Sequence, residues 1–246
     1  MNHKNKLKIL QFIKQVLIPC SIAIDLTLAS IYLISSILLG KSLSNFDFDI
    51  PRTIPVLFAA CKLFAIGFLL TLASCWRRHE LPKKSWCLLL AVGTAFLYVS
   101  QDKIWKFHLF IHRFSWMPEF KSGGIEWVFF YLPIILLTIV LGYRQLIALW
   151  RSYLHSTFFT VLGIGIFLLG GIGVEVINAQ IFKPYIPQIA NSLNTTTAIV
   201  NSVKDTIEEL TELIGESITI FGLTLFFITR LAEVDSKTKR QREGEN

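Results

Sequence analysis

A short acidic segment, DTIEELTELIGE at 205–216, concentrates residues that can bind a cation or exchange protons. On a helical wheel at 100° per residue, its carboxylates fall within an arc of about 60°; they are Asp205, Glu209, Glu212 and Glu216. The apolar run ITIFGLTLFFIT follows directly, so the acidic stripe leads into a helix that can enter a bilayer. Because an unpaired charge is costly in a bilayer, the stripe indicates a site for ions or protons.

Other helices bring further candidate ligands to the same depth. At a rise of 1.5 Å per residue, the intramembrane acids lie within roughly 10 Å of the outer boundary of a ~30 Å core. His108 follows one to two turns above Asp102 if that helix continues, and His112 shares its face. Glutamates with one or two histidines suit a divalent ion, an all-oxygen set suits Ca, Mg or Mn, and a proton relay needs no metal. The predicted cation or metal ligands are Asp102, His108, Glu175, Glu212 and Glu216.

Not every acid in this region is assigned to the site. Glu208 and Glu209 are expected near the interface, where acids solvate the entry of a helix and favour its dipole. His112 in FHLFIHRF is typical of an interfacial amphipathic turn. A water-filled outer vestibule therefore remains an alternative to a binding site.

Asp25 and Lys62 are isolated charges within two apolar runs. Their estimated depths differ by about 6 Å, which a flexible lysine side chain can bridge. We expect a buried structural ion pair that orients the first two membrane helices.

The composition identifies the class of protein. Of the 246 residues, 53% are hydrophobic and only 17% are charged, against about 25% charged in soluble domains. Apolar runs long enough to cross a bilayer predict an all-α, polytopic transmembrane bundle with about six spans. We expect these spans at 16–39, 55–75, 86–108, 125–149, 157–178 and 212–230, within one membrane domain at 16–230.

Basic residues predict the orientation. If both ends are cytoplasmic, inner segments hold 15 Lys and Arg and outer segments hold 8, which favours the N-in, C-in arrangement. The N-tail at 1–15 and the C-tail at 231–246 are then cytoplasmic, and the C-tail is expected to be disordered. This bias explains the net charge of +7 without a nucleic-acid partner. The expected location is the inner or plasma membrane, as a multi-pass protein.

Residues 188–211 carry apolar positions at spacings of three and four, which predicts an outer amphipathic helix continuous with the sixth span. Its apolar face is a candidate contact for a second copy or for a membrane-protein partner. The glycines of GIGIFLLGGIG at 163–173 predict close packing against another helix.

Enzyme motifs are not evident. The sequence contains no H-E-x-x-H and no G-x-S-x-G. Ser100, Asp102 and His108 would form a hydrolytic trio only if the helix bent, since Asp102 and His108 lie about 240° apart on a straight helix. The four cysteines lie within or at the ends of apolar runs and predict packing residues, not a disulfide framework.

The segments SQDKIWKFH, GVE and EELTELIGE together resemble a family of uncharacterised prokaryotic multi-pass membrane proteins. That family has the pattern S-x-D-E-x4-H-E, a later lone Glu and a terminal Glu cluster. The residues that match are Ser100, Asp102, His108, Glu175, Glu208, Glu209 and Glu212, while Lys103 and Leu109 replace two acids. The resemblance implies where a site lies but implies no activity.

The sequence thus favours a non-enzymatic membrane protein with an outward-facing site for a cation, for which a divalent metal ion is one candidate, or for protons. The alternatives are a metal-assisted membrane hydrolase and a structural subunit of a membrane complex.

Overall fold

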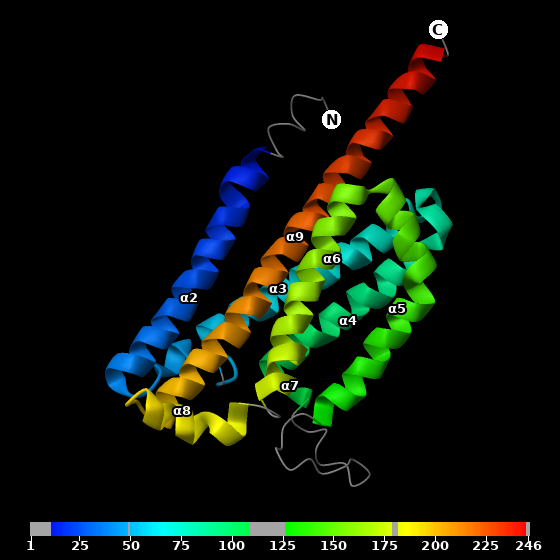
Figure 1. Ribbon diagram of the computed structural model, residues 1–246. Helices are drawn as coiled ribbons and strands as arrows, with labels where there is room; N and C mark the ends of the chain where they lie inside the picture. The colour runs from blue at the N-terminus through cyan, green and yellow to red at the C-terminus, as the bar shows by residue number, and fades with distance from the viewer. Residues whose placement is uncertain (1–10, 49, 109–125, 179–181, 245–246) are drawn as a thin grey trace.

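The computed structural model describes residues 11–48, 50–108, 126–178 and 182–244, and the regular elements in these ranges are helices. A π-helical turn, η1 (Ile13–Leu17), precedes the first long helix, α2 (Ile18–Leu39). The start of α2 and the end of the last described helix, α9 (Thr197–Gly244), lie at the same end of the bundle (Figure 1). The long helices are α2 (Ile18–Leu39), α3 (Ile54–Cys75), α4 (Trp86–Trp105), α5 (Glu126–Ser152), α6 (Leu154–Leu168) and α9 (Thr197–Gly244).

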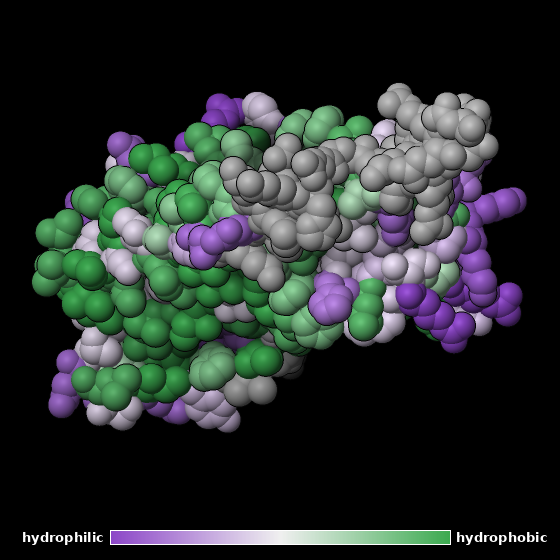
Figure 2. Space-filling model, turned by 90° about the horizontal axis from the view of Figure 1, so that it is seen from above, coloured by the Kyte–Doolittle hydropathy of each residue, from purple (hydrophilic) through white to green (hydrophobic). Residues whose placement is uncertain are grey.

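Six helical segments are long and apolar enough to cross a membrane, as the sequence predicts. Large apolar side chains lie on their outer faces, for example Leu38 at 75% exposed and Leu141 at 69%. Figure 2, seen from above relative to Figure 1, shows apolar side chains over most of the coloured surface and hydrophilic ones at its margins. An apolar exterior of this extent fits lipid, and the predicted all-α membrane class is confirmed. The segments are Gln15–Leu39, Ile54–Cys75, Pro82–Trp105, Val128–Ser152, Leu154–Ile177 and Thr197–Glu233.

Helix α9 lies at the centre of the bundle. In its apolar window 61% of the residues are buried, against 17% for α5, which lies at the periphery. One core cluster joins α3, α4 and α9 through Leu63, Ile66, Leu70, Phe96 and Leu223. The helix with the acidic stripe is therefore the one that the other helices surround.

Glycines let α6 and α9 approach closely, as the sequence predicts. A Cβ on Gly163 would lie 2.4 Å from Thr219 Oγ1, and one on Gly215 would lie 2.4 Å from the Phe167 nitrogen. Neither contact is tolerable for a side chain, so this interface requires glycine on both helices. In lipid, where association depends on packing, such close approach supplies much of the attraction between helices.

Two of the predicted helices differ from the structure by more than the few residues seen at other helix ends. Helix α4 ends at Trp105 and not at 108, because Lys106 adopts a left-handed conformation with φ of 52°. The outer helix expected at 188–211 is divided: α8 (Ile186–Ser192) ends, Asn194 turns with φ of 50°, and α9 begins at Thr197. Left-handed residues end helices because they cannot continue the right-handed backbone.

The C-terminal segment also differs from the disordered tail expected at 231–246, because α9 continues as one helix to Gly244. At 1.5 Å per residue this helix is about 70 Å long, more than twice a ~30 Å hydrocarbon core. Figure 1 shows it projecting beyond the other helices.

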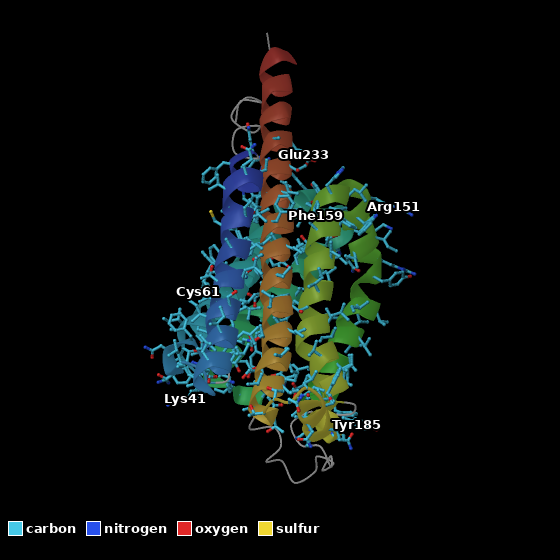
Figure 3. All side chains as sticks on the ribbon, turned by 60° about the vertical axis from the view of Figure 1, so that its left-hand side comes forward. Lys41, Cys61, Arg151, Phe159, Tyr185 and Glu233 are labelled. Carbon is cyan, nitrogen blue, oxygen red and sulfur yellow. The ribbon has the colours of Figure 1, made fainter. Side chains whose placement is uncertain are left out.

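The carboxylates and the arginines of the described residues are distributed unequally between the two ends of the bundle. We call the end near α8 the acidic end, defined by Asp102, Glu175, Glu208, Glu209 and Glu212. We call the other end the basic end, defined by Arg77, Arg78, Lys83, Lys84, Arg151 and Arg230. Figure 3 places Arg151 and Glu233 near the basic end and Tyr185 near the opposite end.

Candidate cation site at the acidic end

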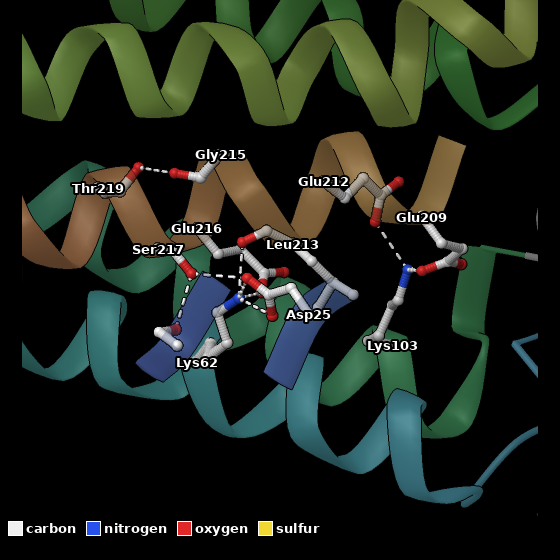
Figure 4. A network of polar contacts seen from close by, with 11 residues as sticks. Asp25, Lys62, Lys103, Glu209, Glu212, Leu213, Gly215, Glu216, Ser217 and Thr219 are labelled. Atoms are coloured by element: carbon white, nitrogen blue, oxygen red, sulfur yellow. Dashed lines mark hydrogen bonds and ion pairs between the residues drawn. The ribbon is translucent and has the colours of Figure 1, made fainter. Parts of the chain in front are cut away.

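Lys62 of α3 organises the deepest group of charges (Figure 4). Its Nζ lies 2.9 and 3.1 Å from the Asp25 carboxylate, 3.5 Å from Glu216 Oε2, and donates to the Leu213 carbonyl at 2.6 Å. Ser217 donates to Asp25 Oδ2 at 2.9 Å. Asp25 and Glu216 are fully buried, so this network joins α2, α3 and α9 out of contact with solvent.

Glu216 is the least satisfied member of that network. Both of its carboxylate oxygens are buried and neither accepts a hydrogen bond from the described residues. Two carboxylates share the single ammonium of Lys62, which leaves one excess negative charge in the network. A charge buried without full compensation is expensive, and binding a proton or a cation removes that cost.

Lys103 of α4 organises a second group nearer the end of the bundle (Figure 4). Its Nζ lies 2.8 Å from Glu209 Oε2 and 2.7 Å from Glu212 Oε2. The three side chains are 11–17% exposed, so they are largely shielded from solvent. Glu209 therefore belongs to this network, which differs from the solvated helix entry expected for it. Glu212 Oε1 accepts no hydrogen bond among the described residues.

The left-handed turn at Lys106 brings His108 back onto α4. Asp102 accepts a hydrogen bond from the His108 backbone nitrogen at 2.8 Å, and its Oδ2 lies 2.7 Å from His108 Nδ1. The bend that this pairing requires is thus present just beyond Trp105. Ser100 does not join the pair, because its hydroxyl is buried and donates to the Ala60 carbonyl at 2.8 Å.

Glu175 lies at the far end of α6, where two irregular elements extend the helix. These are the π-helix η6 (Leu169–Val174) and the short α7 (Glu175–Ile177). A Cβ on Gly171 would lie 2.8 Å from Glu212 Oε1, so glycine there leaves room for that carboxylate. Opposite Glu175 on α9, Lys204 pairs with Asp205 at 2.6 Å and lies 3.6 Å from Glu208.

The Lys103 group, the Asp102–His108 pair and Glu175 meet at one end of a cavity of about 1250 Å³, whereas the Lys62 network does not line it. Its walls come from α3, α4, α5, α6 and α9, and most of its length is apolar. The charged residues on its lining are Asp102, Lys103, Lys106, Glu175, Glu208, Glu209 and Glu212, together with His108. By formal charge the lining holds five carboxylates and two lysines, and Lys204, which is not on the lining, lies 3.6 Å from one of these carboxylates, Glu208. Carboxylates therefore outnumber lysines on the lining at this end of the cavity.

The basic end contains a buried arginine that the sequence analysis did not single out. Arg230 is 3% exposed, and its guanidinium donates to the Trp76 and Arg77 carbonyls at 3.1 Å. It therefore caps the last turn of α3, where unpaired carbonyls concentrate negative charge. In the sequence, a single arginine directly after a long apolar run could have indicated this buried residue.

Tyr153, beside this arginine, is buried and donates to Glu233 Oε2 at 3.1 Å. Burial, with the Glu233 carboxylate as a second cause, raises the pKa of Tyr153 to about 12. The phenol therefore keeps its proton, and its hydrogen bond to Glu233, at physiological pH.

The five predicted ligands do not converge on one point. Glu216 belongs to the Lys62 network, Glu212 to the Lys103 network, and Asp102 pairs with His108. Within the described ranges, no group of three or more His, Cys, Asp or Glu is placed to hold a metal ion. His112 lies outside the described residues. The cysteines are exposed on the outer faces of their helices and not packed in the core.

The helices, their apolar exterior and the buried charges together define a multi-pass helical membrane protein. Within that class, the chain belongs to a family described as a domain of unknown function, DUF8692, which matches residues 23–227. Searches of the curated proteins and of the solved structures gave no match.

Proposed function

We propose that this protein binds a small cation or protons at its acidic end and carries out no covalent chemistry. One observation carries the proposal: five carboxylates and two lysines line one end of a large intramembrane cavity. Like charges held together at low dielectric repel one another, so a bound cation or proton stabilises the arrangement. Lys103 neutralises part of the charge but is already shared by Glu209 and Glu212.

A divalent metal ion is the weaker candidate for this site. The ammonium of Lys103 lies between Glu209 and Glu212, where a metal would need those oxygens. Protons and singly charged cations require fewer ligands from the protein, so they suit carboxylates that are spread around a cavity.

The hydrolase alternative lacks a placed nucleophile and a convergent set of metal ligands in the described part of the chain. The Asp102–His108 pair resembles a general base with its orienting acid. However, Ser100 is turned toward Ala60, and among the described residues no three ligands converge on a metal position. We therefore place no reaction at this site.

We propose further that the acidic end faces the outside of the inner or plasma membrane, with both tails in the cytoplasm. The clustering of Arg and Lys at the basic end supports this orientation. Labelling tests it: with the native cysteines replaced by serine, Lys41→Cys is expected to react with an impermeant maleimide on intact cells. His79→Cys, at the other end, is expected to react only after lysis, and the reverse pattern contradicts the orientation.

The resemblance to prokaryotic membrane proteins with an S-x-D-E-x4-H-E pattern supports the location of the site, and the prokaryotic origin is part of this proposal. A homo-oligomer or a membrane-protein partner also remains a prediction. Leu193, 66% exposed between α8 and α9, is the residue through which crosslinking would test it.

Calorimetry and proton counting test the binding function directly. In nanodiscs, the wild type is titrated with methylammonium, Na⁺ and Mn²⁺ in weak buffer, and released protons are measured with a pH indicator. We expect a singly charged cation to bind and to displace protons. The double substitution Glu175→Gln/Glu208→Gln is expected to weaken binding about tenfold or more. Glu80→Gln, at the basic end, is the matched control, and equal binding by both variants and wild type contradicts the proposal.

A further inference from the structure

We propose that the cavity binds a single-chain amphiphile with a cationic amine head. The head lies among the carboxylates of the acidic end, and the alkyl chain lies along the apolar walls between α4, α5 and α6. This inference rests on the proposed cation-binding function and adds to it the chemical class of the ligand.

The shape of the cavity suits one long chain. Its lining on α4 runs from Leu88 to Asp102, which corresponds to about 21 Å at 1.5 Å per residue. The charged residues are confined to one end of this length, and Leu149 and Phe226 line the other. A ligand that fills the cavity must therefore be polar at one end and apolar over the rest.

The few hydroxyl groups along the walls do not make them polar. Thr94, Thr138 and Thr160 line the cavity, and each donates to a carbonyl of its own helix at 2.8–2.9 Å. Of the other hydroxyls on the lining, Ser156 donates to the Tyr153 carbonyl and Tyr131 to the Tyr98 hydroxyl, both at 3.0 Å, and the remaining one is that of Thr157. Apart from the Tyr98–Tyr131 pair, a ligand would meet mainly methyl groups and aliphatic or phenyl side chains along the wall. Such a wall offers little to a column of water or to a hydrated ion and is well suited to a hydrocarbon chain.

The charge at the acidic end selects the head group. Five carboxylates exceed two lysines there, which opposes a phosphate or carboxylate head. An ammonium group brings a positive charge and three hydrogen-bond donors. Glu212 is 8% exposed, and its Oε1 faces the Gly171 position without a hydrogen bond from the described residues, so it is one acceptor for such a donor.

The packing of α5 gives the chain a route from the bilayer. On this helix, Val128 at one end and Gly142, Ala148 and Leu149 at the other are buried. Over the twelve positions between Val128 and about 140, none is buried. Helix α5 is thus least buried between its ends, where Tyr131 still donates to the Tyr98 hydroxyl of α4 at 3.0 Å. The exposed side chains along this part of α5 are apolar, so a lipid-like molecule that approaches here from the bilayer meets no charged group on this helix.

Binding of tritiated hexadecylamine to the protein in zwitterionic nanodiscs, measured by scintillation proximity, tests the inference. Hexadecanol and methylammonium are the unlabelled competitors, because one lacks the charge and the other lacks the chain. Gly165→Leu fills the cavity, since a Cβ there meets nothing within 4 Å and Gly165 lines the wall. Gly173→Leu is the matched control, because Gly173 lies on the same segment but is not on the lining. Glu175→Gln/Glu208→Gln removes charge from the head region.

We expect tritiated hexadecylamine to bind. Hexadecanol and methylammonium are each expected to displace it at least about tenfold less effectively than unlabelled hexadecylamine does. Gly165→Leu and Glu175→Gln/Glu208→Gln are each expected to weaken binding about tenfold or more, and Gly173→Leu to leave it unchanged. If Gly165→Leu binds as the wild type does, the chain does not use the cavity and the inference is overturned. The proposed function then still stands if methylammonium binding is lost in the glutamine variant. If hexadecanol competes as well as the amine and the glutamine variant is unaffected, both proposals are overturned.

Discussion

Replacing Lys62 with methionine should destabilise the bundle more than removal of any surface lysine. The substitution keeps most of the side-chain volume but removes the ammonium group that contacts Asp25, Glu216 and the Leu213 carbonyl. Two buried carboxylates would then lack a counter-charge. Removing one partner of a buried ion pair typically costs about 3–5 kcal/mol. This corresponds to an increase of the unfolding constant by a factor of roughly a hundred to several thousand.

Equilibrium unfolding in mixed detergent and SDS micelles, followed by tryptophan fluorescence, gives the free energy for each variant. Lys41→Met is the control, because Lys41 is exposed at the acidic end. The triple variant Asp25→Asn/Lys62→Met/Glu216→Gln removes all three charges and should recover more than half of the loss, since no bare charge stays buried. The reasoning fails if Lys62→Met lies within about 0.5 kcal/mol of Lys41→Met, or if the triple variant is no more stable than the single one.

Three further predictions concern other parts of the bundle. Gly215→Ala should destabilise the protein by about 1–3 kcal/mol in the same unfolding assay, because the added Cβ would lie 2.4 Å from the Phe167 nitrogen. Gly165→Ala is the control and should be neutral or stabilising, because a Cβ there meets no atom within 4 Å. Lys103→Glu restores an acid at that position of the S-x-D-E pattern and removes the ammonium between Glu209 and Glu212. It should therefore raise Mn²⁺ affinity at least about tenfold in calorimetry, while Lys41→Glu should not; equal affinities would show that Lys103 does not limit metal binding. Arg230→Met leaves carbonyls at the end of α3 without a donor and should cost about 2–4 kcal/mol; a loss no larger than that of the exposed Arg144→Met would contradict the capping role.

The membrane class and the long helices could be predicted because hydropathy and length alone decide them. Depth along each helix also brought Asp25 and Lys62 within reach of one another, and they lie 2.9 Å apart. The same reasoning placed Glu212 and Glu216 at one level without showing that they face different partners. Depth gives the level of a residue but not the neighbour that it meets around the helix axis.

The division of the acids into two lysine-centred networks was therefore beyond a single-helix argument. A charge balance could have indicated it, because Lys103 interrupts an otherwise acidic pattern and a buried lysine requires a carboxylate. The breaks at Lys106 and Asn194 depend on left-handed backbone, which lysine seldom adopts and asparagine adopts more readily. At Asn194 the apolar spacing of three and four continued across the break, so periodicity could not reveal it.

The Lys62 network also bears on how the protein is made. Asp25 and Lys62 enter the membrane on the first two helices, and each charge costs about 2.5–3.5 kcal/mol at the centre of an isolated span. Their mutual pairing is available early, but Ser217 and the Leu213 carbonyl arrive only with α9, which is synthesised after the other helices described above. Until then the first hairpin carries polar groups without their full set of partners. A chain that lacks α9 therefore exposes buried charges whose hydrogen-bond partners are missing. We expect membrane quality control to recognise a protein truncated before α9.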